Sequence, residues 1–427
     1  MINEGIAQSS DKQSDQGAQR NALILTLLAA FLGWLFDGVE QGLFPVVARP
    51  ALLSLLGPGG EGGVGNWMGI ITAAFLVGAA FGGLGFGWLG DRIGRIRAMS
   101  LSILFYSLFS GMGFFATAPW HLGVFRFLSA LGMGGEWALG VALVMEVWPE
   151  RFRPYLAGMI GAAANVGFLL IGLVAAIVPV TRSSWRWMFL VGATPALLTF
   201  FIRLFVPESG RWQKARNAVK ERDRISPLRE IIHAGLAGRM FVGLVLSSVA
   251  LIGTWASVQW IPLWADQLTG GLIPQAKANA QMVSALGAIT GSLLAPILLG
   301  RVLRRWGYFI LCALSLVTSA FLFRTQTAYG NVFLVLVYAT ATATASFYGW
   351  LPLYLPELFP TRMRATGQGV CFNMGRIFAA VGAMMSGQLV AHYGGYARMG
   401  ATITLIYLVG MVAIWFSAET RGKGLPE

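Results

Sequence analysis

The sequence predicts an all-α integral membrane protein whose twelve transmembrane helices form two similar halves of six. The first observation is composition: 56% of the 427 residues are hydrophobic, 11% are charged, and the mean hydropathy is +0.66. These values are too apolar for a soluble domain. The second is a set of twelve nearly uncharged runs, each long enough to cross a bilayer. They begin near Asn21, Trp67, Ala98, Trp120, Tyr155, Trp185, Met240, Ala278, Trp306, Asn331, Ala365 and Tyr396.

The third observation is an internal repeat with a spacing of 211 residues. The segment 146–153, Glu-Val-Trp-Pro-Glu-Arg-Phe-Arg, recurs at 357–364 as Glu-Leu-Phe-Pro-Thr-Arg-Met-Arg. Glu208 and Glu419 stand at the same spacing in a second repeated motif. A repeat of this length predicts two similar halves with a binding site where they meet.

Each copy of the first motif also predicts where a helix ends. Because the proline cannot continue a helix, Glu146 and Glu357 are expected near helix C-termini. A carboxylate is unfavourable there, since the C-terminal end of the helix dipole is negative. We therefore expect Arg153 to neutralise Glu146, and Arg364 to neutralise Glu357.

The distribution of Lys and Arg predicts the topology. The N-terminal segment and alternate loops carry 22 of the 31 cations, the opposite loops carry 6 and the spans carry 3. By the positive-inside rule, both termini are expected in the cytoplasm and the protein in the cell membrane. The net charge of +13 is explained in this way without a nucleic-acid partner. The predicted parts are a cytoplasmic tail (1–20), a six-helix bundle (21–206), a cytoplasmic linker (207–239), a second bundle (240–417) and a cytoplasmic tail (418–427).

The loop after the second run carries a recognisable motif. It reads Gly87-Trp-Leu-Gly-Asp-Arg-Ile-Gly-Arg-Ile-Arg97, and it resembles the signature between helices 2 and 3 of the major facilitator superfamily. The counterpart in the second half, 300–305, keeps the basic residues but lacks the aspartate. The segment 132–158 resembles the sialate/lactate proton-symporter branch of the superfamily, and the segments 207–212 and 419–422 resemble the related sugar porters. This resemblance implies the twelve-helix fold of two bundles, and a transport function.

Five ionisable residues inside the predicted spans are candidates for function. They are Asp37, Glu40, Arg126 and Glu136 in the first half and Arg376 in the second. Charges at this depth are costly, so they are expected to face a cavity or a partner. Acids that gain and lose a proton suit proton coupling. The resemblance to sugar porters implies a pair between Asp37 and Arg126, with Glu40 as the alternative acid.

A lone arginine near the membrane midplane suits an anionic solute, because its planar fork can bind a carboxylate at two points. We expect Arg376 to bind the solute, supported by Asn373 and by Asn165, which stands at the repeat-related position. The other candidates are aromatic and amide side chains at span depth: Trp255, Gln259, Tyr348 and Trp350. Pro262 is expected to break or bend the seventh span.

Matched charges also gather at the predicted cytoplasmic ends of the spans. They are Asp91, Arg92, Arg95, Glu146, Arg153, Glu208, Arg211, Glu357, Arg364 and Glu419. Each exposed pair would contribute less than about 1 kcal/mol. A network of such pairs can nevertheless bias a two-state rocking equilibrium. We expect these residues to form a cytoplasmic gate.

No metal-ligand spacing, phosphate loop or catalytic triad is present, so neither an enzyme nor a cofactor is expected. The first hypothesis is a proton-coupled symporter of a small organic acid such as a sialate or a monocarboxylate. The second is a sugar or polyol carrier. The third is a sensor that no longer transports, against which the intramembrane acids argue. The expected partners are a small anionic solute, protons and the lipid bilayer, and the expected state is a monomer.

Overall fold

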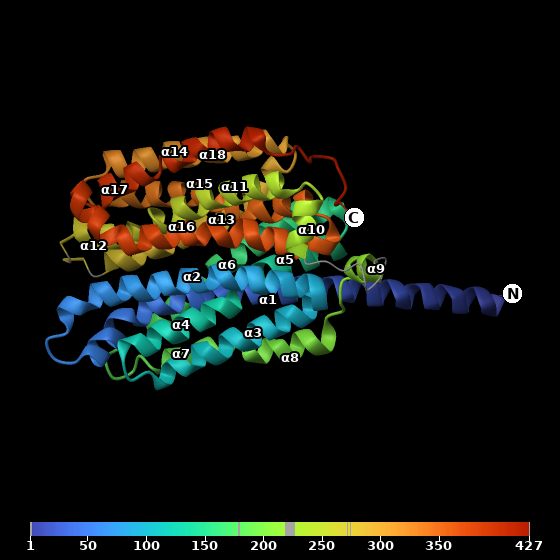
Figure 1. Ribbon diagram of the computed structural model, residues 1–427, viewed down its shortest axis with the longest axis horizontal. Helices are drawn as coiled ribbons and strands as arrows, with labels where there is room; N and C mark the ends of the chain where they lie inside the picture. Colours follow the sequence, from blue (N-terminus) through green and yellow to red (C-terminus); the bar gives the residue numbers. More distant parts are fainter. Residues whose placement is uncertain (1, 178–179, 218–226, 271, 274, 427) are drawn as a thin grey trace.

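The computed structural model describes the chain except for residues 1, 178–179, 218–226, 271, 274 and 427, and except for the side chains of residues 2–19 and of a few further positions. The described part is helical and contains no strand. Two groups of helices lie side by side, and both ends of the chain emerge at the same end of the molecule (Figure 1). We call this end the terminal face; it carries Arg95, Glu146 and Ser417.

The first half contains six spans built from eight helices. They are α1 (Ile2–Leu56), α2 (Glu61–Ile93), α3 (Arg95–Met112), α4 (Pro119–Met133), α5 (Glu136–Val147), α6 (Arg153–Ile177), α7 (Trp187–Ala193) and α8 (Ala196–Phe205). The fourth span is divided into α4 and α5 at Gly134 and Gly135. A Cβ atom at Gly134 would overlap the backbone of α2 at Ala79, so a glycine is required for the close approach of the two helices.

The second half also contains six spans built from eight helices. They are α11 (Ala237–Trp255), α12 (Ile261–Leu268), α13 (Gln275–Leu299), α14 (Arg304–Thr325), α15 (Asn331–Tyr354), α16 (Arg364–Tyr393), α17 (Tyr396–Ile403) and α18 (Ile406–Ala413). The expected break in the seventh span is present, because α11 ends at Trp255. Pro262 lies in the first turn of α12, where its missing N–H costs no helical hydrogen bond.

The predicted fold class is confirmed. Ten helical stretches of the described chain are long and apolar enough to cross a membrane. The consecutive helices α7 and α8 form the sixth span, and the 30-residue helix α16 forms the eleventh. These spans coincide with the twelve predicted runs.

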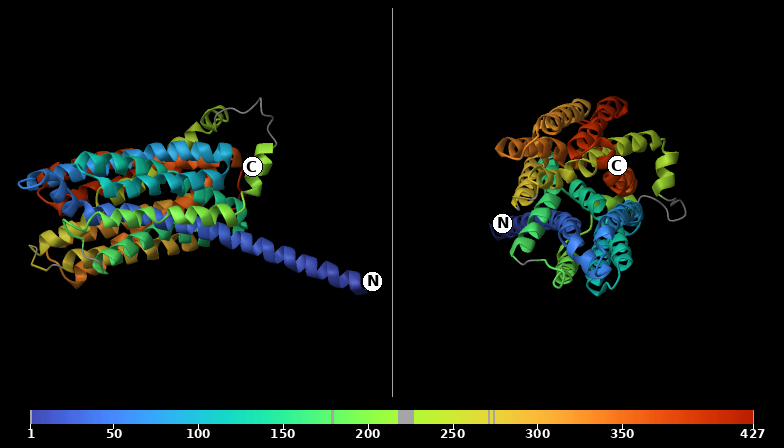
Figure 2. Two further views of the ribbon diagram at one scale, coloured as in Figure 1. Left: turned by 90° about the horizontal axis from the view of Figure 1, so that it is seen from below. Right: turned by 90° about the vertical axis from the view of Figure 1, so that its left-hand side faces the viewer.

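The predicted tails and linker differ in their structure. Residues 2–20 form the first turns of α1, which project beyond the bundle at the terminal face (Figure 2). The predicted linker, 207–239, contains the short helices α9 (Gly210–Asn217) and α10 (Pro227–His233), and its centre, 218–226, lies outside the described residues. Residues 417–426 return along the terminal face, with Leu425 buried.

The two halves meet along two lines of contact. Helix α2 packs against α16, and α6 packs against α13 and α15. Glycines allow these approaches: a Cβ at Gly83 would overlap Asn373, and one at Gly161 would overlap the backbone of Tyr348. Trp137 of α5 stacks on Phe372 of α16 with ring centroids 4.0 Å apart. The space left between these contacts is the candidate site.

Candidate functional site

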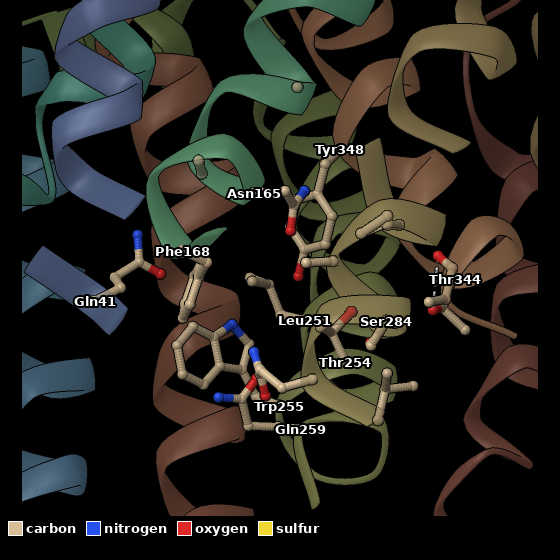
Figure 3. Close-up of a pocket in the computed structure, with 18 of the residues that line it drawn as sticks. Gln41, Asn165, Phe168, Leu251, Thr254, Trp255, Gln259, Ser284, Thr344 and Tyr348 are labelled. Carbon is tan, nitrogen blue, oxygen red and sulfur yellow. Dashed lines mark hydrogen bonds between the residues drawn. The ribbon is translucent and has the colours of Figure 1, made fainter. Parts of the chain in front are cut away.

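A cavity of about 100 Å³ lies between the two halves. Its walls come from α1 and α6 of the first half and from α11, α13, α15 and α16 of the second, together with the segment between α11 and α12. Figure 3 shows Phe168, Trp255 and Gln259 on one side, and Thr254 and Ser284 on another. Among the described residues that line the cavity, aromatic rings, amides and hydroxyls occur together with one cationic side chain, Arg376.

Arg376 is the most distinctive of these residues. Its side chain is buried, with 3% of the residue exposed, and its Nη1 has no hydrogen-bond partner within the described chain. The guanidinium lies over the ring of Phe372, with Cζ 5.4 Å from the ring centroid. A buried cation with an unused donor is costly unless an anion completes it. The cavity can therefore accept a carboxylate at this point.

Five of the seven residues expected to bind the solute line this cavity: Asn165, Trp255, Gln259, Tyr348 and Arg376. The other two are placed elsewhere. Asn373 donates from Nδ2 to the carbonyl of Gly134 at 3.1 Å, so its amide joins the two halves. Trp350 is fully buried between Tyr308 and Tyr354, with ring centroids 5.1 Å and 4.7 Å away. It follows Tyr348 by two residues and so points to the opposite side of α15.

Other lining residues were not expected. Gln41 stands one turn after Asp37, and Phe372 stands one turn before Arg376, so helical spacing from the charged residues was a usable signal. Gln281 and Ser284 of α13 also line the cavity. The sequence around Gln281 and Ser284 contains no signal that these two polar residues line a cavity.

The partner of Arg126 is Glu40, not Asp37. Arg126 Nη1 pairs with Glu40 Oε1 and donates to the backbone carbonyl of Glu40 at 3.1 Å. The hydroxyls of Ser110 and Ser129 donate to the same carboxylate at 2.6 Å and 2.7 Å. The expected pair between Asp37 and Arg126 is thus wrong, because Glu40 binds the guanidinium of Arg126. The alternative acid named by the sequence is the one that pairs.

We expect Glu40→Gln to destabilise the protein strongly. The change leaves Arg126 as a buried charge without its counter-ion, which costs about 3 to 5 kcal/mol. Thermal unfolding in detergent measures the effect. Ser110→Ala is the matched control, since it removes one hydrogen bond to the same carboxylate and leaves the ion pair. Equal unfolding temperatures for the two variants would contradict a structural role for the pair.

Asp37 and Glu136 are buried acids without partners. They are 0% and 1% exposed, and all four carboxylate oxygens lack a hydrogen-bond partner within the described chain. Asp37 lies between Trp34 and Gln41, the two α1 residues that line the cavity. The charged groups that act on it are Glu136, Arg376 and Glu40. Asp37 and Arg376 are therefore groups of opposite charge that act on each other, and Arg376 lines the cavity.

The glutamates of the repeated motif do not pair with the arginines that sequence suggested. Glu146 Oε1 accepts from Arg95 Nη2 and from Arg364 Nη1, both at 3.0 Å. Arg364 belongs to the other half, so this glutamate links the two bundles. Arg153 pairs with Glu150 instead, at 3.0 Å.

Glu357, the repeat-related acid, stays within its own half. Arg304 donates to both of its oxygens, at 3.0 Å from Nε and 2.8 Å from Nη2, and the hydroxyl of Thr420 donates to it as well. The expected pair with Arg364 is therefore absent. The two copies share this pattern, since Glu146 also binds the arginine at a helix start, Arg95, and accepts from the hydroxyl of Ser209 at 2.5 Å; only the contact of Glu146 with Arg364 has no counterpart at Glu357.

Asp91 and Arg95 complete the contacts between the halves. Asp91 accepts from the backbone N–H of Thr366 at 2.7 Å, near the N-terminus of α16, where the helix dipole favours an anion. Arg95 Nη2 donates to the carbonyl of Thr361 at 2.7 Å and Nη1 pairs with Asp91. Arg92 and Arg211, which were also expected at the gate, are exposed, and Arg92 lies over Trp88.

Glu208 and Glu419 cap helices rather than pairing with arginine side chains. Glu208 accepts from the backbone N–H of Arg95 at 2.9 Å, and Glu419 from that of Arg304 at 3.0 Å. Burial raises the pKa of Glu208 despite these hydrogen bonds. At Glu419 burial also raises the pKa, but the backbone N–H donors outweigh it, so its pKa is lowered. As the pH falls, Glu208 is expected to take up a proton before Glu419.

In the described chain, no group of three or more His, Cys, Asp or Glu side chains is arranged to hold a metal ion. The chemistry available at the site is that of a fixed cation, buried acids and neutral hydrogen-bonding groups. These residues can bind an anion and exchange protons.

Comparisons with known proteins agree with this architecture. The model of the Major Facilitator Superfamily matches residues 22–383. The chain is 30% identical over 406 residues to a probable 4-methylmuconolactone transporter of Cupriavidus pinatubonensis, with 93% of this chain and 91% of that protein covered. It is 25% identical to the sialic acid transporter NanX of Escherichia coli, over 89% of each chain.

Among solved structures, the proton:xylose symporter XylE bound to 6-bromo-6-deoxy-D-glucose has a TM-score of 0.77 at 19% identity, over 95% of this chain and 98% of that one. At this identity the likeness shows the fold alone. The resemblance inferred from the loop motif and the repeat is thus confirmed. The chain is a multi-pass membrane transporter, not an enzyme, and it belongs to the major facilitator superfamily.

Proposed function

We propose that the protein is a proton-coupled symporter of a small organic acid, such as a sialate or another monocarboxylate. The observation that carries the proposal is Arg376, a buried cation with an unused donor at the wall of the cavity between the halves. Its supporting groups are Asn165, Tyr348 and Gln259, which offer hydrogen bonds to the rest of the solute. The relatives named as carriers of sialic acid and 4-methylmuconolactone support an organic acid as the solute.

Proton coupling is assigned to Asp37. Asp37 is the acid that acts on Arg376, whereas Arg126 pairs with Glu40. A solute carboxylate that binds Arg376 displaces this interaction, and Asp37 then favours its protonated form. Loading of the solute and uptake of a proton thereby favour each other.

Alternating access follows from the contacts at the terminal face, which we place in the cytoplasm on the distribution of basic residues. In this structure Asp91, Arg95 and Glu146 bind groups of the second half, so the cytoplasmic ends of the bundles are held together. Rocking of the halves breaks these contacts and opens the cavity to the cytoplasm.

A sugar or polyol carrier is the second candidate. Amides of Gln41, Asn165, Gln259 and Gln281 line the cavity and suit hydroxyl groups. Uptake of labelled sialic acid into proteoliposomes, with monocarboxylates or with D-xylose as competitors, separates the two. Competition by acids alone supports the proposal, and competition by the sugar alone overturns it in favour of the second candidate. Uptake of neither class under any gradient would favour a sensor.

Asp37→Asn is expected to abolish uphill uptake while exchange of solute across the membrane continues. The amide keeps the size of the side chain but cannot carry a proton, so the proton gradient no longer drives the solute. Uptake against a solute gradient and counterflow, measured in the same vesicles, check this. If uphill uptake survives in the variant, Asp37 is not the coupling residue.

A further inference from the structure

Glu136 is a buried acid that has no role in the proton exchange proposed for Asp37. It is the first residue of α5, and neither of its oxygens has a hydrogen-bond partner within the described chain. Its Oε1 lies against α1 at Gly33, where a Cβ atom would overlap it. Gly33 precedes Asp37 by about one helical turn. Glu136 therefore lies beside the face of α1 that carries Asp37.

Two arginines inside the spans, Arg126 and Arg376, interact with other acids. Arg126 of α4 pairs with Glu40 of α1. Arg376 of α16 acts on Asp37, and no cation is among the groups that act on Glu136. The nearby Ser102 donates its hydroxyl to the carbonyl of Gly132 at 2.6 Å, not to Glu136. The hydroxyl of Tyr106 of α3, on which these acids act, has no partner within the described chain and is neutral at physiological pH. Glu136 thus has no counter-ion in the part of the chain that the structure describes.

An ionised carboxylate in such a place is strongly disfavoured, and a buried group of this kind takes up a proton instead. Resting on the function proposed above, we propose that Glu136 stays protonated throughout the cycle. Asp37 alone then exchanges one proton for each solute monoanion, and transport is electroneutral. Glu136 is a positioning residue. Because it is neutral, it adds no negative charge beside Asp37 when Asp37 gains or loses a proton.

The charges of the ionisable residues inside the spans support a ratio of one proton to one solute monoanion. In the empty state, the negative charge of Asp37 balances Arg376. In the loaded state the solute carboxylate balances Arg376, and an O–H bond has formed on Asp37 with a proton taken from the side of entry. Glu40 and Arg126 cancel in both states. Both states therefore cross the membrane without net charge, whereas a dianion would leave one negative charge unbalanced.

The protonation of Glu136 can be measured on the empty protein, without knowledge of the solute. Infrared spectra at neutral pH are expected to contain the carbonyl stretch of a protonated carboxylic acid. That band should disappear in Glu136→Gln and remain in Asp37→Asn. Glu150→Gln, which removes a half-exposed acid at the terminal face, is the control and should keep the band. A band that persists in Glu136→Gln would overturn the proposal.

The stoichiometry is tested with sialic acid in proteoliposomes. A pH gradient at zero membrane potential should drive uptake, and an inside-negative potential without a pH gradient should not. Glu136→Gln, a neutral mimic of the protonated acid, should preserve both results. Stimulation of the wild type by the potential, lost in Glu136→Gln, would mean that Glu136 carries a second proton and would overturn the proposal. Absence of any response to the pH gradient would instead refute the proposed proton coupling, while the infrared result on Glu136 would stand.

Discussion

Arg376→Ala is expected to lower the affinity for the transported acid by about a hundredfold. The change removes a charge-assisted contact in a buried site, which is worth about 2 to 3 kcal/mol. The Nη1 of Arg376 is unused in the described chain and its guanidinium rests on Phe372, so the side chain can bind a solute carboxylate in place of its interaction with Asp37. Equilibrium binding of the acid found by the uptake screen measures the loss.

Arg376→Lys is the informative control. It keeps the positive charge but loses the planar fork, so binding should also be impaired, although less than in the alanine variant. Tyr348→Phe removes a neutral hydrogen-bonding group from the same cavity and should cost less than either. Unchanged affinity in Arg376→Ala would make this residue structural and would favour the sugar carrier.

Glu146→Gln is expected to open the terminal face, and Glu357→Gln is not. Glu146 is shared by Arg95 and Arg364, so its neutralisation leaves two buried guanidinium groups without their common anion across the interface. Breaking such a buried pair costs about 3 to 5 kcal/mol. If this cost destabilises only the conformation with a closed terminal face, the equilibrium between the closed and open conformations shifts by more than a hundredfold. Glu357 makes its ion pair inside the second half, so the same change there leaves the interface intact.

Labelling of single cysteines measures this opening. Val144 and Leu358, 0% and 2% exposed, are suitable positions at the ends of the fourth and tenth spans. The native Cys312 and Cys371 must first be replaced, since both are free thiols. Labelling should rise in Glu146→Gln and stay low in Glu357→Gln. Equal labelling in both variants would mean that Glu146 only terminates a helix and does not hold the halves together.

Much of the architecture could be read from the sequence because it depends on local and periodic features. A run of apolar residues long enough for a bilayer can satisfy its backbone only as a helix, so the twelve spans follow from composition along the chain. The repeat of segment 146–153 at 357–364 likewise required two similar halves. Arg376 stood out because a charge inside a span is rare and costly.

The tertiary structure alone decided which charges meet. Asp37 and Glu40 are less than one turn apart, so spacing could not choose between them as the partner of Arg126; Ser110 and Ser129, from two other helices, select Glu40. In the same way, the repeat could not reveal that Glu146 binds Arg364 across the interface while Glu357 binds Arg304 within its half. Residues two apart in one helix, such as Tyr348 and Trp350, face opposite sides, and only packing shows which side is the cavity.

The sequence by itself determined the membrane-spanning helices, the two halves and the kinds of charge at their centre. The pairing of those charges depends on distances between helices, and these arise only when the two halves pack.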